Sequence, residues 1–391
     1  MKENFRFIII GFFIQLTTMA FGRFAYTLIL PDMMRSLRLT NTGMGILGTG
    51  IVIGYLANSL LSGKLADIIG AELTVKISIF SLSLSLFTMG FFSHFALLFV
   101  SSIFLGAGAS GSYIPFIHIL NIHYRKRGRA FGIVMGGTGV GIVLCGYIIP
   151  PLLALSESYG YRVSWYALSL INLIVLIITI LFLKPDRSAA EEKGEEQVEK
   201  RIIQIFRGNM SLIITTIIYF FVGISYIIYA TYFGAYCIDE IGFTARKTGM
   251  IWSLFGINVI YAGIICGILL DKFNKINVAL IFTPIFAFSI FIIIPFRAEL
   301  FFYFSTFLFG FSLMSFITTI ASLIITEVDK YEMARVFGAS TFMHGSGMVI
   351  GTSIGGLLKD ITGTFKVPLF ISFSILIGCV FLFFILKKIK A

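Results

Sequence analysis

The sequence predicts an all-α membrane protein with twelve transmembrane helices in two pseudo-symmetric six-helix bundles. Three observations predict this fold class. Hydrophobic residues make up 58% of the 391 residues and charged residues only 13%, whereas soluble globular proteins are about 45–50% apolar and about 25% charged. Polar breaks divide the chain into twelve apolar segments, and a bilayer helix needs about 20 apolar residues. Finally, the two halves of the chain carry the same short motifs in the same order.

The apolar segments follow one another with short connections. They cover residues 7–30, 43–63, 73–93, 95–121, 130–154, 163–183, 210–236, 248–270, 276–296, 300–326, 336–358 and 367–386. The one long interruption is rich in charge, with four glutamates between Glu191 and Glu196, and we expect a solvated linker there. We therefore predict an N-terminal bundle over residues 1–183, a cytoplasmic linker over 184–208 and a C-terminal bundle over 209–391.

The formal net charge of +11 is unevenly distributed. Of the 30 Lys and Arg residues, 21 fall on the side of the two termini, 8 fall on the opposite side, and Arg23 lies within the first segment. By the positive-inside rule, both termini are expected to be cytoplasmic. The positive charge thus predicts the orientation of a multi-pass protein, which we expect in a prokaryotic inner membrane, and it gives no reason to expect a nucleic-acid partner.

Three motifs recur between the two halves. Thr42-Gly43-Met44 returns as Thr248-Gly249-Met250, and Arg129-x-Phe131-Gly132 returns as Arg335-x-Phe337-Gly338, each after 206 residues. Gly63-x-Leu65-x-Asp67 returns as Gly267-x-Leu269-x-Asp271 after 204 residues. Two related six-helix halves joined by a linker are typical of a secondary transporter, whose substrate site lies near the middle of the membrane.

One of these repeats carries a family resemblance. The loop expected after the second segment reads Gly63-Lys64-Leu65-Ala66-Asp67-Ile68-Ile69-Gly70, which is similar to the G-x-L-a-D-r-x-G-r-r/k signature of major facilitator superfamily transporters. The chain resembles that superfamily over essentially its whole length. It keeps Gly63, Leu65, Asp67 and Gly70, while the usual basic positions hold Ile68, Ala71 and Glu72. The first segment, with Gly22-Arg23-Phe24-Ala25-Tyr26, resembles a bacterial branch of the superfamily.

The resemblance implies a cytoplasmic gate around the signature residues Gly63, Asp67 and Gly70. In the superfamily arrangement, Asp67 would face Arg335, and Asp271 would face Arg129. Such ion pairs would hold the cytoplasmic side closed when the protein faces outward, and they would separate when it opens inward. The alternative is that these are ordinary solvated loop charges.

Arg23 is the basic residue that falls inside an apolar segment, where a charge costs at least about 2.5–3.5 kcal/mol by insertion scales. On a helical wheel of 100° per residue, one arc of about 140° contains the polar residues Gln15, Thr18, Arg23 and Tyr26. This polar stripe predicts a water-filled cavity, in which the planar guanidinium would suit a carboxylate bidentately. The alternative is that Arg23 snorkels toward the outer membrane boundary.

Further polar residues are candidates for the same cavity. Tyr229 and Tyr232 lie on one narrow face of the seventh segment, although an aromatic belt at the membrane interface is the alternative. His118 and His344 are the histidines inside segments, and each is a candidate proton carrier or donor to the substrate. For His118 the alternative is an ordinary residue at a helix end. Asn258 is a further candidate, with hydrogen bonding between helices as its alternative.

All 19 acidic residues map to loops, tails or helix ends, which argues against a carboxylate proton relay through the membrane centre. Together with a lone Arg23, this predicts a basic cavity and a small organic anion, such as a monocarboxylate, as the transported substrate. We expect a monomeric transporter and no enzyme activity, with lipid and a small molecule as partners, protons as a candidate coupling ion, and no cofactor or metal. Two alternatives stay open: an exporter of hydrophobic, drug-like compounds, and a receptor or scaffold on the same fold.

Overall fold

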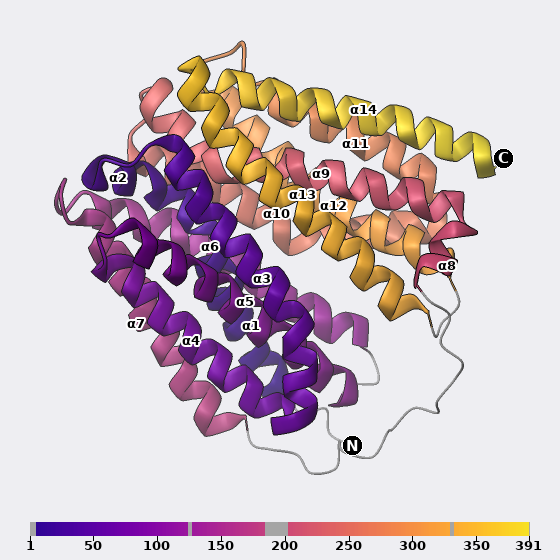
Figure 1. Cartoon of the computed structure of the whole chain (residues 1–391), viewed down its shortest axis with the longest axis horizontal. Helices are drawn as coiled ribbons and strands as arrows, with labels where there is room; N and C mark the ends of the chain where they lie inside the picture. The colour runs from indigo at the N-terminus through magenta and orange to yellow at the C-terminus, as the bar shows by residue number, and fades with distance from the viewer. Residues whose placement is uncertain (1–4, 124–126, 184–201, 329–331, 391) are drawn as a thin grey trace.

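The computed structural model describes residues 5–123, 127–183, 202–328 and 332–390, and the regular secondary structure within these ranges is helical throughout. Two groups of helices lie side by side, one formed by the first half of the chain and the other by the second half (Figure 1). The predicted linker, residues 184–208, falls mainly outside the described residues. Its described part contains one short helix, α8 (Ile202–Arg207).

The first bundle begins with a helix of three consecutive parts, α1 (Phe5–Met19), the π-helical turn η1 (Ala20–Phe24) and α2 (Tyr26–Leu37). It continues with α3 (Asn41–Ile69), α4 (Ala71–Phe91), α5 (Phe95–His123), α6 (Arg127–Leu153) and α7 (Gly160–Phe182). The second bundle contains α9 (Met210–Ala235) with the π-helical turn η3 (Tyr236–Glu240), α10 (Ala245–Lys272), α11 (Lys275–Phe291), α12 (Glu299–Thr326), α13 (Met333–Thr362) and α14 (Lys366–Lys390).

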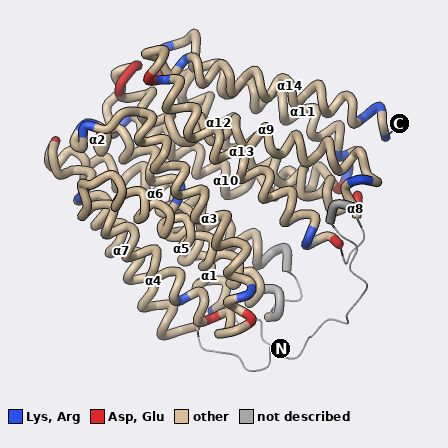
Figure 2. The backbone as a smooth tube through the Cα atoms, viewed as in Figure 1, with Lys and Arg blue, Asp and Glu red and all other residues tan. Residues whose placement is uncertain are grey.

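These helices confirm the predicted fold class. Ten helical runs in the described part of the chain are long and apolar enough to cross a membrane. The apolar helix α11 is shorter, with 17 residues, and the glycine-rich helix α13, with 30 residues, packs against α3 and α9. Charged residues gather at the helix ends, while the middle of most helices carries none (Figure 2). This distribution fits a chain whose helix centres lie in lipid.

The helix ends define two sides of the molecule. The start of α1, the end of α7, the start of α8 and the end of α14 lie along one edge, which we call the linker side (Figure 1). The opposite ends form the far side. Two helices that start on the far side have matching caps, because the Thr40 hydroxyl accepts from Gly43 N at 3.0 Å and the Thr244 hydroxyl accepts from Lys247 N at 3.2 Å. Both caps satisfy orphan backbone donors at a helix start.

The signature residues are helical and do not form a loop, which corrects one expectation. Residues 63–69 form the last two turns of α3, and the chain turns only at Gly70, with φ +90° and ψ 146°. Glycine tolerates this positive φ without a steric penalty. Asp67 therefore lies within the regular helix α3 and not in a loop.

The two bundles use the same internal contacts. In the first, α1 packs on α6, α3 on α5, and α4 on both α5 and α7; in the second, α9 packs on α13, α10 on α12, and α11 on both α12 and α14. The bundles meet along two seams, α3 against α13 and α6 against α10, and α2 also contacts α9. The two seams are equivalent under the internal repeat, so each half supplies the same pair of helices to the interface.

The contact between α3 and α5 depends on glycine. A Cβ atom added at Gly106 would lie 1.8 Å from the Ile51 carbonyl oxygen, and one added at Gly54 would lie 1.8 Å from the Ile103 carbonyl oxygen. Small residues at such crossings let membrane helices approach closely.

We therefore expect Gly106→Ala to lower the midpoint of thermal unfolding of the purified protein, because overpacking of a close contact typically costs about 1–3 kcal/mol. Gly378→Ala is the matched control, since Gly378 is also helical but no atom lies within 4 Å of its added Cβ. The control should keep or raise the midpoint. Equal midpoints for the two variants would contradict the close approach of α3 and α5.

Candidate functional site

Arg23 lies near the middle of the first membrane-crossing helix, inside the π-helical turn Ala20–Phe24. The Ala25 N–H donates to the Ala20 carbonyl at 2.9 Å, five residues back. Such a turn inserts one residue, so the helix after it is rotated by about 100° relative to a continuous α-helix. The wheel that placed Gln15, Arg23 and Tyr26 on one face assumed a continuous helix, and the structure separates them. π-turns are frequent at functional sites.

The Arg23 side chain reaches from the first bundle to the second. Its Nη2 donates to the hydroxyl of Tyr226 on α9 and, at 3.2 Å, to the sulfur of Met348 on α13. Its Cζ lies 5.4 Å from the ring centroid of Tyr55 on α3 and 5.8 Å from those of Phe24 and Tyr226. Aromatic faces attract a cation at these distances. None of the ion pairs formed by the described residues involves Arg23.

His344 on α13 lies beside this guanidinium and is buried between two tyrosines. Its ring stacks on Tyr219, with centroids 4.0 Å apart, and on Tyr226, at 5.5 Å. His344 Nδ1 lies 2.8 Å from the Tyr219 carbonyl oxygen. Because a carbonyl only accepts, Nδ1 donates, and Nε2 of the neutral ring is left as an acceptor. His344 lies one helical turn before Met348, which contacts Arg23.

We call this group the Arg23 site; it comprises Arg23, Tyr55, Tyr219, Tyr226, His344 and Met348. Sequence reasoning named only Arg23 and His344 of this group. The signal for two others was available, since Tyr219 and Tyr226 are seven residues apart and share a helix face after two turns.

The tyrosines named from the sequence are engaged inside the bundles. The Tyr26 hydroxyl donates to the Met44 carbonyl at 2.7 Å, and the Tyr232 hydroxyl donates to the Thr352 carbonyl at 2.6 Å. The Tyr229 hydroxyl bonds to Ser305 Oγ on α12 at 2.7 Å, and its ring stacks on Phe309. The structure therefore does not bring Tyr229 to Arg23.

The remaining named residues are also dispersed. Gln15 is fully buried against α6, where Thr138 Oγ1 donates to Gln15 Oε1 at 3.5 Å and Gln15 Nε2 has no hydrogen-bond partner. Asn258 is buried between α10 and α12, and its Nδ2 donates to the Leu254 carbonyl at 2.8 Å. The His118 side chain is exposed near the linker-side end of α5.

On the far side, a carboxylate of one bundle caps a helix of the other. Asp360, in the last turn of α13, accepts four hydrogen bonds at the start of α3. Its Oδ1 accepts from Asn41 N at 3.1 Å and Asn41 Nδ2 at 2.8 Å, and its Oδ2 accepts from Thr42 N at 2.7 Å and Thr42 Oγ1 at 2.6 Å. A negative charge at a helix N-terminus is further stabilised by the helix dipole. Asp360 thus fastens the two bundles together.

Further contacts close the far side. Arg35 of α2 forms an ion pair with Asp239 of η3 at 3.3 Å. Thr49 Oγ1 of α3 bonds to Thr352 Oγ1 of α13 at 2.7 Å. On the second seam, a Cβ at Gly146 would lie 2.3 Å from the Gly249 carbonyl oxygen, so α6 and α10 touch there through backbone.

On the linker side both seams are looser. A cavity of about 580 Å³ separates α6 from α10, lined by Phe12, Gly132, Ile133, Gly136, Val140, Ile260 and Ile264. On the other seam, no atom lies within 4 Å of a Cβ added at Gly63 of α3 or at Gly338 of α13. The Arg23 site thus lies between a closed far side and a looser linker side.

The residues assigned to a gate lie on this looser side. The Asp67 and Asp271 side chains are exposed, and Arg335 is half-buried. The side chain of Arg129 lies outside the described residues. The pairs Asp67–Arg335 and Asp271–Arg129 stay predictions, for a state in which the linker side is closed.

The described residues show no arrangement for metal chemistry. No group of three or more His, Cys, Asp or Glu side chains gathers among them. The cysteines Cys145, Cys237, Cys266 and Cys379 are free and buried.

Comparison with known proteins gives this architecture a family. The model of the Major Facilitator Superfamily matches residues 12–352, most of the chain. The chain is a member of the Major Facilitator Superfamily. It is therefore a multi-pass transporter and no enzyme, which confirms the resemblance found in the sequence.

Relatives of this transporter carry different substrates. It is 24% identical over 368 residues to the hexuronate transporter of Bacillus subtilis (strain 168), covering 88% of this chain and 85% of the relative. It is 23% identical over 364 residues to multidrug resistance protein 2 of the same strain, covering 90% and 88%. The relatives thus share the family with this chain but differ from one another in the function that their names give.

Solved structures agree on the fold. The crystal structure of the nucleoside transporter NupG superposes with a TM-score of 0.80 at 15% sequence identity, covering 99% of this chain and 100% of that one. A bacterial homologue of the human lysosomal transporter Spinster, in an inward-facing and unoccupied conformation, gives 0.78 at 12% identity, covering 99% and 98%.

The cap made by Asp360 leads to a prediction about conformation. Asp360→Asn replaces one acceptor oxygen by an amide donor that faces other donors, and a hydrogen bond to a charged group is worth about 1.5–3 kcal/mol. We expect the population with an open far side to rise about tenfold or more. Leu155 and Phe296 are exposed far-side residues of opposite bundles. Spin labels at these two positions would report the change as a longer label-to-label distance in double electron–electron resonance.

Glu299→Gln is the matched control, because Glu299 is a far-side carboxylate whose partner, Lys247 at 2.7 Å, lies in the same bundle. The control should leave the distance between the labels unchanged. A distance distribution that is the same in Asp360→Asn and in the unsubstituted protein would rule out the cap as a lock.

Proposed function

We propose that this transporter moves a small organic anion, monocarboxylate-like in its charged group, across the membrane by alternating access, with Arg23 as the group that binds the anion. The observation that carries the proposal is a guanidinium held between the two bundles without a carboxylate partner among the described residues. Arg23 has five N–H donors, and a carboxylate accepts two of them in parallel.

The electrostatics of the Arg23 site favour an anion over a cation. Tyr226 and Met348 provide neutral hydrogen-bond acceptors for Arg23, and the faces of the Tyr55 and Tyr226 rings attract its charge. These groups stabilise the positive charge but do not neutralise it. A bound carboxylate would neutralise it in a low-dielectric setting, where charge pairs interact strongly. The hexuronate transporter supports this class by name, since a hexuronate carries a carboxylate.

The orientation of the transport cycle follows from the charges. We place the linker side in the cytoplasm of a prokaryotic cell. On that side lie 21 of the 30 basic residues, and Lys and Arg are in excess in the cytoplasmic loops of membrane proteins. With the far side closed by Asp360 and Arg35, the present state then faces inward. Opening to the outside requires the loss of these contacts and closure around Asp67 and Asp271. We expect the transporter to act as a monomer, with protons as a candidate coupling ion.

Export of hydrophobic, drug-like compounds is the second candidate. The aromatic residues around Arg23 favour it, because Tyr55, Tyr219 and Tyr226 offer apolar faces, and multidrug resistance protein 2 is a relative. A cationic compound would, however, be repelled by Arg23. Flux of carboxylates and of neutral aromatic compounds in the same vesicles would separate the two candidates.

The first test is substitution of Arg23. In proteoliposomes that take up the preferred carboxylate, Arg23→Lys should raise the apparent KM about 10- to 100-fold, because one point charge replaces a planar pair of donors, and charged hydrogen bonds are worth about 1.5–3 kcal/mol. Arg23→Ala should abolish saturable uptake. Arg246→Ala removes an exposed charge at the far side and serves as the control with unchanged KM. Unchanged uptake in Arg23→Ala would refute the proposal.

A second test separates the sequence-based candidate Tyr229 from Tyr226. Tyr226→Phe removes the hydroxyl that holds the Arg23 guanidinium in position, and we expect KM to rise about 10- to 100-fold, because a hydrogen bond to a charged group is worth about 1.5–3 kcal/mol. Tyr229→Phe removes the bond to Ser305 inside the second bundle, so the unfolding midpoint should fall while KM stays the same. The opposite pattern, with KM sensitive to Tyr229 alone, would move the binding site into that bundle.

A further inference from the structure

A second cavity lies away from the Arg23 site, at the linker-side end of the second bundle. It has a volume of about 340 Å³ and is bounded by α10, α11, α12 and α14. Its lining comprises Leu270, Phe273, Asn274, Lys275, Ile276, Leu323, Thr326 and Lys390. The volume is at the lower end of the range for small-molecule sites. We call it the two-lysine cavity.

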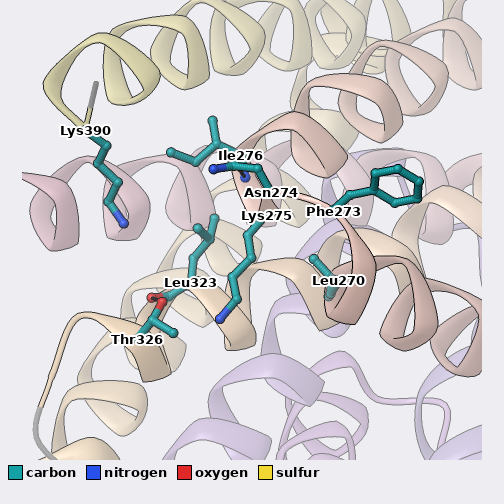
Figure 3. A pocket seen from close by; sticks show the side chains of 8 residues that line it. All are labelled: Leu270, Phe273, Asn274, Lys275, Ile276, Leu323, Thr326 and Lys390. Carbon is teal, nitrogen blue, oxygen red and sulfur yellow. Dashed lines mark hydrogen bonds between the residues drawn. The ribbon is translucent and has the colours of Figure 1, made fainter.

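Two lysines enter this cavity from different helices. Lys275 begins α11 and Lys390 ends α14, and their side chains approach the same space (Figure 3). Lys275 Nζ donates to the Ser322 carbonyl at 3.1 Å, and Lys390 Nζ pairs with Glu327. An ammonium has three donors, so each lysine keeps donors for a ligand. The two ammonium groups also interact electrostatically with one another.

The charge around the cavity is positive. No acidic side chain is among the eight lining residues. Glu327 offsets one lysine, and Asp271, with an exposed side chain, interacts electrostatically with Lys275. Lys272, Lys387 and Lys388 lie at the same ends of α10 and α14 and are exposed. Like charges held close together are unfavourable unless an anion bridges them.

The rest of the lining is apolar. Leu270, Phe273, Ile276 and Leu323 form walls beside the two ammonium groups. The cavity lies at the ends of helices, three of which, α10, α12 and α14, are long and apolar enough to cross a membrane, so we expect it near the depth at which lipid headgroups meet acyl chains. A ligand with an anionic group and an attached hydrocarbon chain fits both parts of this lining.

We propose that the two-lysine cavity binds the headgroup phosphate of an anionic phospholipid from the leaflet on the linker side. Basic pockets between membrane helices bind such headgroups. The apolar walls favour a lipid over free phosphate, because they would contact the first carbons of its chains. This site is independent of the substrate site, since it involves α10, α11, α12 and α14 of the second bundle and none of the residues around Arg23.

The test measures binding of phosphatidylglycerol to the full-length purified protein by native mass spectrometry, with phosphatidylcholine and inorganic phosphate as the other arms. We expect phosphatidylglycerol to bind best. Lys275→Gln and Lys390→Gln should each weaken it about fivefold, as expected for one lysine at a charged membrane surface. Lys272→Gln removes a neighbouring exposed charge outside the cavity and should have little effect.

Arginine substitutions distinguish a loss of lipid binding from a loss of folding. The double variant Lys275→Arg, Lys390→Arg keeps both charges and should keep the lipid, and its unfolding midpoint shows that it is folded. The proposal is overturned if phosphatidylcholine binds equally well, or if Lys272→Gln weakens binding as much as Lys275→Gln. It is also overturned if inorganic phosphate displaces the lipid at equal concentration, since the site would then serve free phosphate.

Discussion

The structure depends on keeping one positive charge between two helical bundles inside a membrane. Arg23 is half-buried and has no carboxylate partner among the described residues, although a charge inside a membrane protein is costly. Its neighbours stabilise the positive charge only in part, because a hydroxyl, a thioether and three aromatic faces attract a cation without cancelling its charge. The neighbours come from η1 and α3 of the first bundle and from α9 and α13 of the second, so the two bundles must meet at this depth for the charge to be tolerated.

The fold could be predicted from the sequence because it follows from hydropathy, charge asymmetry and an internal repeat, all of which are properties of whole segments. Predicted segments and observed helices agree to within several residues at most ends, as in 300–326 against Glu299–Thr326. The signature around Asp67 was assigned to a loop on the family resemblance, yet the glycine at which the helix ends is Gly70, the last residue of the signature.

The Arg23 site was harder to predict, for two physical reasons. The π-turn Ala20–Phe24 rotates the second half of the helix, and no local sequence rule signalled it, so the stripe from Gln15 to Tyr26 was wrong. Helix α9 is buried on nearly all sides, with 20 of its 26 residues buried, and periodicity cannot choose a face on such a helix. The sequence analysis therefore named Tyr229 and not Tyr226, although Tyr229 bonds to Ser305 and Tyr226 is the one that contacts Arg23.

One ridge of α13 links the Arg23 site to the far-side lock. His344, Met348, Thr352, Gly356 and Asp360 are four residues apart, the spacing of a packing ridge, and over 16 residues they span about 24 Å. Met348 contacts Arg23, Thr352 contacts Thr49, and Asp360 caps α3. Because the ridge belongs to one helix, loss of the Asp360 cap and rotation of α13 would also change the acceptors available to Arg23. An anion bound to Arg23 beside those acceptors therefore changes the balance between the two sides through a single rigid element.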